Sequence, residues 1–70
     1  MKRRDLIKQI RDAANAAGIE FVSLRNSGGH EVFSLGGLRM AVPNHREIAE
    51  GTARSIQRQA AGKLGEEWWT

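Results

Sequence analysis

Two glycine pairs, Gly28-Gly29 and Gly36-Gly37, constrain the fold of this chain more than any other feature. Glycine adopts positive φ angles without steric cost, so each pair permits a tight reversal of the chain. Short runs of alternating apolar and polar residues flank the second pair, which predicts a two-residue β-hairpin turn. We therefore expect three antiparallel strands, at residues 19–25, 30–35 and 38–42.

The alternation in the second and third expected strands separates a core face from an open face. The positions expected to face the core are Phe33, Leu35, Leu38, Met40 and Val42. His30 and Arg39 then lie together on the open face. Residues 19–25 alternate plausibly in either register, so the buried face of the first strand stays undecided. Pro43 cannot donate to a β-ladder and is expected to end the third strand.

Helical periodicity flanks the strands on both sides. Apolar residues recur at helical spacing from residue 4 to residue 17, and Gly18 follows as a terminator. A second helix is expected after the strands, with Gly62 as its stop. The apolar positions are Leu6, Ile7, Ile10, Ala13, Ala14 and Ala17 in the first helix and Ala49, Ala53, Ile56 and Ala60 in the second. This order predicts an α+β domain, a three-stranded antiparallel sheet with two helices on one face.

The composition limits the possible classes of function. A chain of 70 residues forms one small domain, which buries only about 60% of the surface that its unfolded form exposes. With no cysteine and two histidines, we expect no disulfide, no metal site and no cofactor. No apolar segment is long enough for a membrane span, and we expect a cytoplasmic protein. The net charge of +3, concentrated in the first two thirds, favours a polyanionic partner such as nucleic acid.

The last residues differ in character from the rest of the chain. We expect residues 1–62 to form the domain and residues 63–70 to form a C-terminal tail. Trp68 and Trp69 lie in this tail, where a free segment would leave them unusually exposed. They are therefore expected to dock on their own sheet or on a partner.

The candidate functional residues centre on His30. Within residues 25–33 it is the side chain that titrates near neutrality, and it follows a glycine pair directly. Gly28 and Gly29 leave room beside it for a bulky anionic ligand. Taken alone, these residues are also compatible with a plain hairpin turn that carries a surface histidine.

Four arginines are candidates for phosphate contacts. Arg25 and Arg39 can offset phosphate charge if they share the face of His30. Arg54 and Arg58, four residues apart on the second helix, form either a solvated stripe or a phosphate-binding pair. His45, in the connecting loop, is expected to support the fold or contact the ligand rather than act as a second catalytic group.

The chain carries, in order, Arg25-x-x-Gly28-Gly29-His30-x-x-Phe33, Val42-Pro43-Asn44-His45 and Gly51-Thr52-x-Arg54-Ser55-Ile56-x-x-Gln59-Ala60. Together these motifs resemble the HicA (YcfA-like) toxins of bacterial toxin–antitoxin pairs, over residues 2–62. The resemblance implies a double-stranded-RNA-binding-like α-β-β-β-α fold. It also implies mRNA cleavage by a histidine, here His30, and neutralisation by a HicB antitoxin. The chain departs from the family's usual Gly-Ser-His, because Gly29 stands in place of the serine.

RNA supplies its own nucleophile, the 2′-hydroxyl, so a histidine can promote its cleavage without a metal ion. A neutral His30 is suited to act as general base, and attack on the adjacent phosphate gives a 2′,3′-cyclic phosphate and a 5′-hydroxyl end. Two alternatives remain open. One is a domain that binds double-stranded RNA without cleaving it; the other is an interaction module whose open sheet face and tryptophan tail bind a protein.

Overall fold

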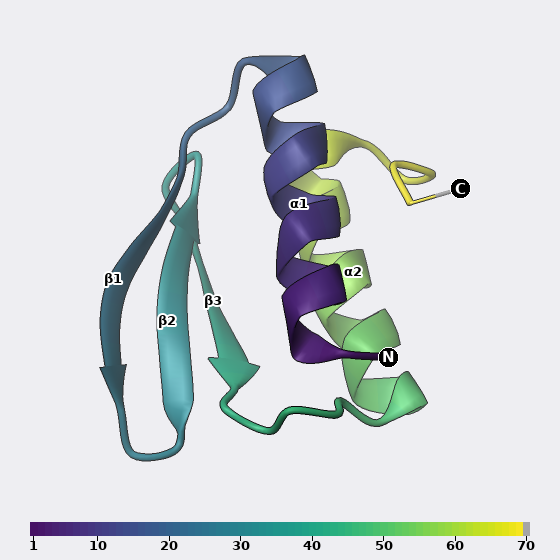
Figure 1. The fold of residues 1–70 in the computed structure, drawn as a ribbon. Helices are drawn as coiled ribbons and strands as arrows, with labels where there is room; N and C mark the ends of the chain where they lie inside the picture. The colour runs from purple at the N-terminus through teal and green to yellow at the C-terminus, as the bar shows by residue number, and fades with distance from the viewer. Residues whose placement is uncertain (70) are drawn as a thin grey trace.

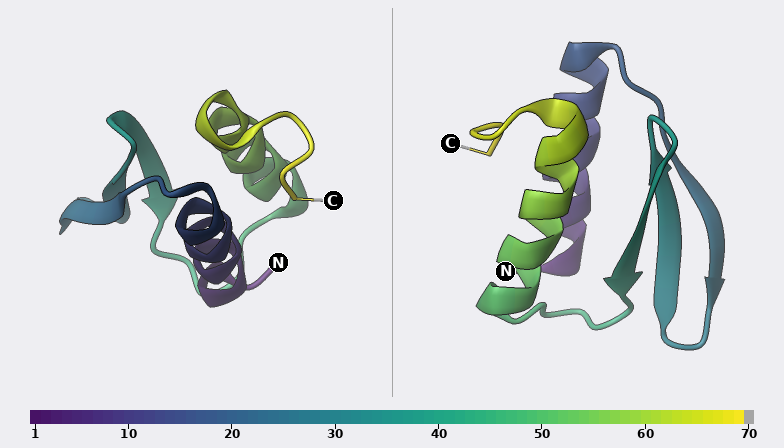
Figure 2. Two further views of the ribbon diagram at one scale, coloured as in Figure 1. Left: turned by 90° about the horizontal axis from the view of Figure 1, so that it is seen from above. Right: turned by 180° about the vertical axis from the view of Figure 1, so that it is seen from behind.

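The computed structural model describes residues 1–69. Helix α1 precedes three strands and helix α2 follows them (Figure 1). The elements are α1 (Arg3–Ala17), β1 (Phe21–Ser27), β2 (His30–Leu35), β3 (Leu38–Pro43) and α2 (Glu50–Leu64). Both helices lie on the same side of the sheet (Figures 1 and 2), which leaves the other sheet face open. This arrangement confirms the expected α+β, double-stranded-RNA-binding-like fold.

The strands form a meander in the order β1-β2-β3, and both pairs are antiparallel. All four turn glycines have positive φ angles, from 55° at Gly36 to 93° at Gly37. An L side chain rarely adopts such angles, which explains why glycine occupies both turns. Gly18, with φ of 69°, ends α1 in the left-handed conformation that the sequence predicts.

The core lies between the helices and the covered face of the sheet. Its buried residues are Leu6, Ile7, Ile10, Ala14, Phe33, Leu35, Met40, Val42, Ile48, Ala53, Ile56 and Ala60. Most of the expected inward positions are confirmed, and Leu38 packs half-buried against this core. Ala17 and Ala49 are exposed instead, because they lie at helix ends. Ile48 was not anticipated; its backbone pairs with Met1, which brings the loop before α2 onto the core.

Strand β1 is shifted from its expected position and irregular. Its pairing with β2 slips between Ser23 and Arg25. This bulge explains why no single alternation describes the strand, because residues before and after it follow different registers. Phe21 stacks on Phe33 with ring centroids 4.8 Å apart, whereas Leu24 at the bulge is 48% exposed.

The expected stop of the second helix at Gly62 is wrong. Helix α2 continues to Leu64 and ends at Gly65, whose φ is 96° and whose N–H donates to the Ala61 carbonyl. Leu64 packs against the core, so burial of its side chain favours another half-turn of helix. The helix thus crosses the expected boundary between residues 62 and 63.

Trp68 docks on its own chain, but on α2 and not on the sheet. Its indole Nε1–H donates to the Gln57 carbonyl at 2.8 Å, and its ring packs against the core. Within residues 1–69, neither helix is long and apolar enough to cross a membrane.

Candidate functional site

His30 lies in a groove at the β3 edge of the sheet, between this edge and α2. The groove has a volume of about 340 Å³, and its lining residues are His30, Ala41, Pro43, Gly51, Thr52, Ser55, Ile56 and Gln59. His30 and Pro43 are direct cross-strand partners. The groove therefore joins the first residue of β2 and the last residue of β3 to the stretch of α2 from Gly51 to Gln59.

The position of His30 follows from the turn that precedes it. Gly28 and Gly29 have φ angles of 61° and 82°, and a Cβ atom at either would meet nothing within 4 Å. The space beside the histidine is therefore open, as the sequence predicts. The His30 Nδ1 lies 3.4 Å from the Gly28 carbonyl oxygen. In the tautomer with the proton on Nδ1, this contact is a long hydrogen bond and Nε2 is free to accept a proton.

Asn44 ties the glycine turn to the end of β3. Its backbone N–H donates to the Gly29 carbonyl at 2.9 Å, and its side-chain amide donates to the Asn26 amide oxygen at 2.5 Å. Gly29 precedes His30 directly, so these bonds restrain the backbone that carries the imidazole. Asn44 belongs to one of the three sequence motifs, and its structural role was not anticipated.

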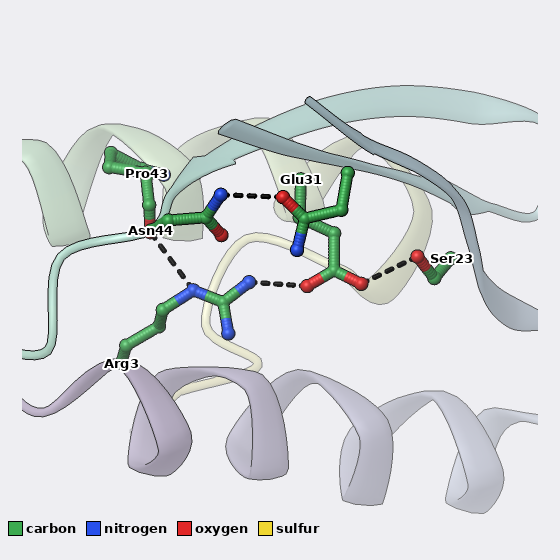
Figure 3. A network of polar contacts seen from close by, with 6 residues as sticks. Arg3, Ser23, Glu31, Pro43 and Asn44 are labelled. Atoms are coloured by element: carbon green, nitrogen blue, oxygen red, sulfur yellow. Dashed lines mark hydrogen bonds and ion pairs between the residues drawn. The ribbon is translucent and has the colours of Figure 1, made fainter. Parts of the chain in front are cut away.

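A second set of polar contacts holds the same strand ends from the helix side (Figure 3). The Arg3 guanidinium forms an ion pair with the Glu31 carboxylate and donates from Nε to the Pro43 carbonyl at 2.9 Å. The Ser23 hydroxyl donates to the other Glu31 oxygen at 2.5 Å. The contacts therefore link α1 to all three strands. Glu31 follows His30 in the sequence, and Pro43 is its cross-strand partner.

The charge state of Glu31 follows from this arrangement. The Ser23 hydroxyl, and then the Arg3 guanidinium, lower the pKa of the Glu31 carboxyl because both favour its ionised form. The Arg3 and Glu31 side chains are 22% and 18% exposed. Arg3 thus acts in holding the fold together, although by composition alone it counts among the basic residues available to a polyanion.

The strand register places two of the predicted arginines on the face of His30. Arg25 pairs with Val32 and Arg39 pairs with Ser34, and residues two and four positions from His30 on β2 share its face. At about 3.3 Å per residue, Val32 and Ser34, the partners of Arg25 and Arg39, lie roughly 7 and 13 Å from His30 along β2. Arg25 is therefore the nearer of the two.

None of the four predicted arginines lines the His30 groove. Arg54 forms an exposed ion pair with Glu50 at 3.5 Å, one helical turn away. Arg58 lines a different hollow, beside Trp69. His45 is exposed in the loop after β3 and does not line the groove.

The polar groove residues of α2 are Thr52, Ser55 and Gln59, and none was a predicted site residue. The sequence did contain a signal, since these positions recur every three or four residues and so share one helix face. What it lacked was the orientation of that face, which depends on how α2 packs beside β3. A basic hollow of about 240 Å³, lined by Lys2, Arg3, Arg4 and Arg46, lies at the start of α1.

The identity of the chain rests on a comparison with protein families. Residues 4–61 match the family described as the HicA toxin of bacterial toxin–antitoxin systems. Searches of curated proteins and of solved structures give no significant match. The family match covers most of the chain, including every groove residue and the motifs that meet there. The chain therefore belongs to the HicA family of toxins, whose members act together with an antitoxin partner.

Proposed function

We propose that this chain is a metal-independent endoribonuclease that cleaves mRNA in the cytoplasm, with His30 as general base. The observation that carries the proposal is the groove itself. His30 shares this groove with Thr52 and Ser55. These residues belong to a different sequence motif from His30. A histidine, hydroxyl donors and an open, unobstructed turn fit a phosphodiester with an adjacent 2′-hydroxyl.

The reaction uses a nucleophile that the substrate supplies. Nε2 of a neutral His30 accepts the 2′-hydroxyl proton as the 2′-oxygen attacks the adjacent phosphorus. The bond from phosphorus to the 5′-oxygen breaks, and that oxygen takes a proton from solvent. The products are a 2′,3′-cyclic phosphate and a 5′-hydroxyl end.

Groups around the histidine stabilise the negative charge that develops on the phosphate. The Thr52 and Ser55 hydroxyls can donate hydrogen bonds to its oxygens. They lie in the first turns of α2, where the partial positive charge of the helix N-terminus favours an anion. Arg25 supplies a full positive charge on the face of His30.

The partner that neutralises the toxin is, in this proposal, a HicB-like antitoxin. The open sheet face carries His30, Arg25 and Arg39, so an acidic surface laid on it would hide the base and neutralise both arginines. Such charge complementarity mainly accelerates association and makes it sensitive to salt. RNA binding and modification of His30 by diethyl pyrocarbonate should both decrease in the complex.

The experiment that tests the proposal is RNA cleavage by the purified chain with analysis of the product ends. In the presence of EDTA we expect cleavage to continue and the upstream fragments to end in a 2′,3′-cyclic phosphate. Loss of cleavage on chelation, with recovery on adding a divalent ion, would contradict metal independence. Binding of double-stranded RNA with no cleavage under any condition would favour the non-catalytic alternative.

A further inference from the structure

A second hollow lies on α2, apart from the His30 groove. It has a volume of about 310 Å³ and is lined by Arg58, Ala61, Glu66 and Trp69. Glu66 and Trp69 follow residues 4–61, the part of the chain that matches the family. The hollow is therefore built partly from residues that the family pattern does not include.

The Trp69 ring is held in place by the turn that precedes it. Gly65 ends α2, and the chain folds back beside the helix on the side away from the sheet (Figures 1 and 2). Trp68 fixes this turn through its bond to Gln57. Trp69 then meets Trp68 edge to face, with centroids 5.7 Å apart and ring planes at 80°. Trp69 is half-buried, so part of its surface faces solvent beside Arg58.

One row of side chains on α2 connects the two hollows. Thr52 and Ser55 line the His30 groove, and Arg58 and Ala61 line the Trp69 hollow. These four residues are spaced three apart, so consecutive members are neighbours on the helix surface. From Ser55 to Ala61 the row advances about 9 Å along the helix axis and turns about 120° around it, a surface path of roughly 14 Å. This path equals the length of about four stacked nucleotides.

We propose that the Trp69 hollow binds a nucleobase of the same RNA strand whose phosphate lies in the His30 groove. The inference rests on the proposed ribonuclease function. The indole face of Trp69 stacks on the base, as aromatic side chains do in single-strand binding. Arg58 lines the hollow, next to Ser55 on the helix surface, and binds the phosphate adjacent to the base.

Glu66 gives the hollow a preference among bases. An ionised carboxylate is only an acceptor of hydrogen bonds, so it favours a base that presents N–H donors and disfavours a bare phosphate. Guanine presents two such donors, N1–H and the N2 amino group, on one edge. The hollow therefore selects guanine about four nucleotides from the cleaved bond.

Binding is tested in the His30→Ala background, where RNA stays intact, by fluorescence anisotropy with short single-stranded RNAs. Trp69→Ala should weaken binding about 10-fold or more, the range measured for one stacked base, whereas Trp69→Phe retains a stacking surface and should lose less. Arg58→Gln should weaken binding and reduce its salt dependence. Lys63→Gln, the same charge change at a residue that lines neither hollow, should have less effect.

Base preference is tested in the same assay and in cleavage. RNAs that carry guanine near the cleavage site should bind more tightly than those with adenine or inosine there, and Glu66→Gln should reduce this difference. In otherwise wild-type protein, Trp69→Ala should raise KM more than it lowers kcat. Near-ultraviolet circular dichroism of each variant checks that the Trp68 environment is intact.

The outcomes separate this inference from the function on which it rests. If the wild-type protein cleaves RNA, and Trp69→Ala binds and cleaves with unchanged base preference, the hollow is not a base site and the ribonuclease stands. If Trp69→Ala loses affinity for the antitoxin alone, the hollow is a protein contact and the inference is wrong. If the wild-type protein neither binds nor cleaves RNA, both fail together.

Discussion

The two glycine turns of the sheet carry the same local signal but have different surroundings. At the β2–β3 turn, a Cβ on Gly36 would lie 2.9 Å from the Ile19 methyl Cγ2, and Lys63 is also close. At the β1–β2 turn, a Cβ on Gly28 or Gly29 would meet nothing within 4 Å. Gly36 in one turn is packed against the chain, whereas Gly37 and both glycines of the other turn have open space beside them. Positive φ thus explains why glycine is present, and the neighbours of each turn determine what the glycine allows.

The two turns also differ in the polar contacts that hold them. Asn44 and the Arg3–Glu31–Ser23 contacts surround the open turn, while the packed turn is held by apolar contact and by the bond from Gly36 N–H to the Glu20 carbonyl. Polar groups restrain the first turn without filling the space beside His30. This arrangement restrains the backbone that carries His30 and leaves the space beside its turn open.

The largest effect is expected for His30→Ala, which removes the proposed general base from the open turn. Loss of a general base typically slows a reaction about 10²–10⁴-fold, while the unfolding free energy should change by less than about 0.5 kcal/mol because the side chain is exposed. Single-turnover cleavage and urea denaturation measure the two quantities. His45→Ala is the matched control and should keep its activity. Cleavage at the wild-type rate by folded His30→Ala would remove this residue from the mechanism.

The next effect is on stability, at the packed turn. Gly36→Ala should lower the unfolding free energy by about 2–3 kcal/mol, because a strained φ adds to the clash with Ile19. Gly28→Ala has the strain without the clash and should cost about 1 kcal/mol. Gly62→Ala, in a helix and with open space around it, should raise stability by about 0.5–1 kcal/mol. Equal losses at Gly36 and Gly28 would show that packing does not distinguish the two turns.

A smaller effect, dependent on pH, is expected for Glu31→Gln. The pKa of Glu31 is lower in the folded protein than its ordinary value of 4.5, so ionisation stabilises the fold above that value and the contribution is lost as pH falls through the folded-state pKa. At pH 7 the substitution should therefore lower the unfolding free energy by about 1–2 kcal/mol. At pH 3 the difference in unfolding free energy between wild type and variant, measured by urea denaturation, should be smaller. Glu20→Gln, at an exposed residue, serves as control. A loss that stays constant from pH 7 to pH 3 would contradict the ionic role.

The sequence predicted most of the fold because its signals are local. Glycine pairs mark the turns, alternation marks β2 and β3, and helical periodicity marks α1 and α2. It failed where a distant contact decided the outcome: burial of Leu64 extended α2 beyond Gly62, and the β1 bulge broke the alternation.

For the candidate site, too, sequence reasoning reached the residues that are close in the sequence and missed those that only packing brings together. His30, Gly28 and Gly29 were predicted as one site because they are adjacent in the sequence, and this stays a prediction. Thr52, Ser55 and Gln59 were missed because their place in the groove depends on the packing of α2 beside β3. Arg54 and Arg58 were grouped with His30 by charge, yet neither lines its groove.

The smallest structural change, Gly29→Ser, restores the Gly-Ser-His pattern that the resemblance leads one to expect. The serine has open space but must adopt a φ of 82°, so stability should fall by about 1 kcal/mol. Its hydroxyl would stand directly before His30 in open space, where it can donate to a phosphate oxygen. We therefore expect the rate of RNA cleavage to rise by about 3- to 10-fold, the effect of one neutral hydrogen bond of roughly 1 kcal/mol. Gly29→Ala imposes the same backbone strain without the hydroxyl and is the matched control. If serine and alanine change the rate equally, the hydroxyl has no part in the reaction, and the open turn serves only to leave room for the substrate.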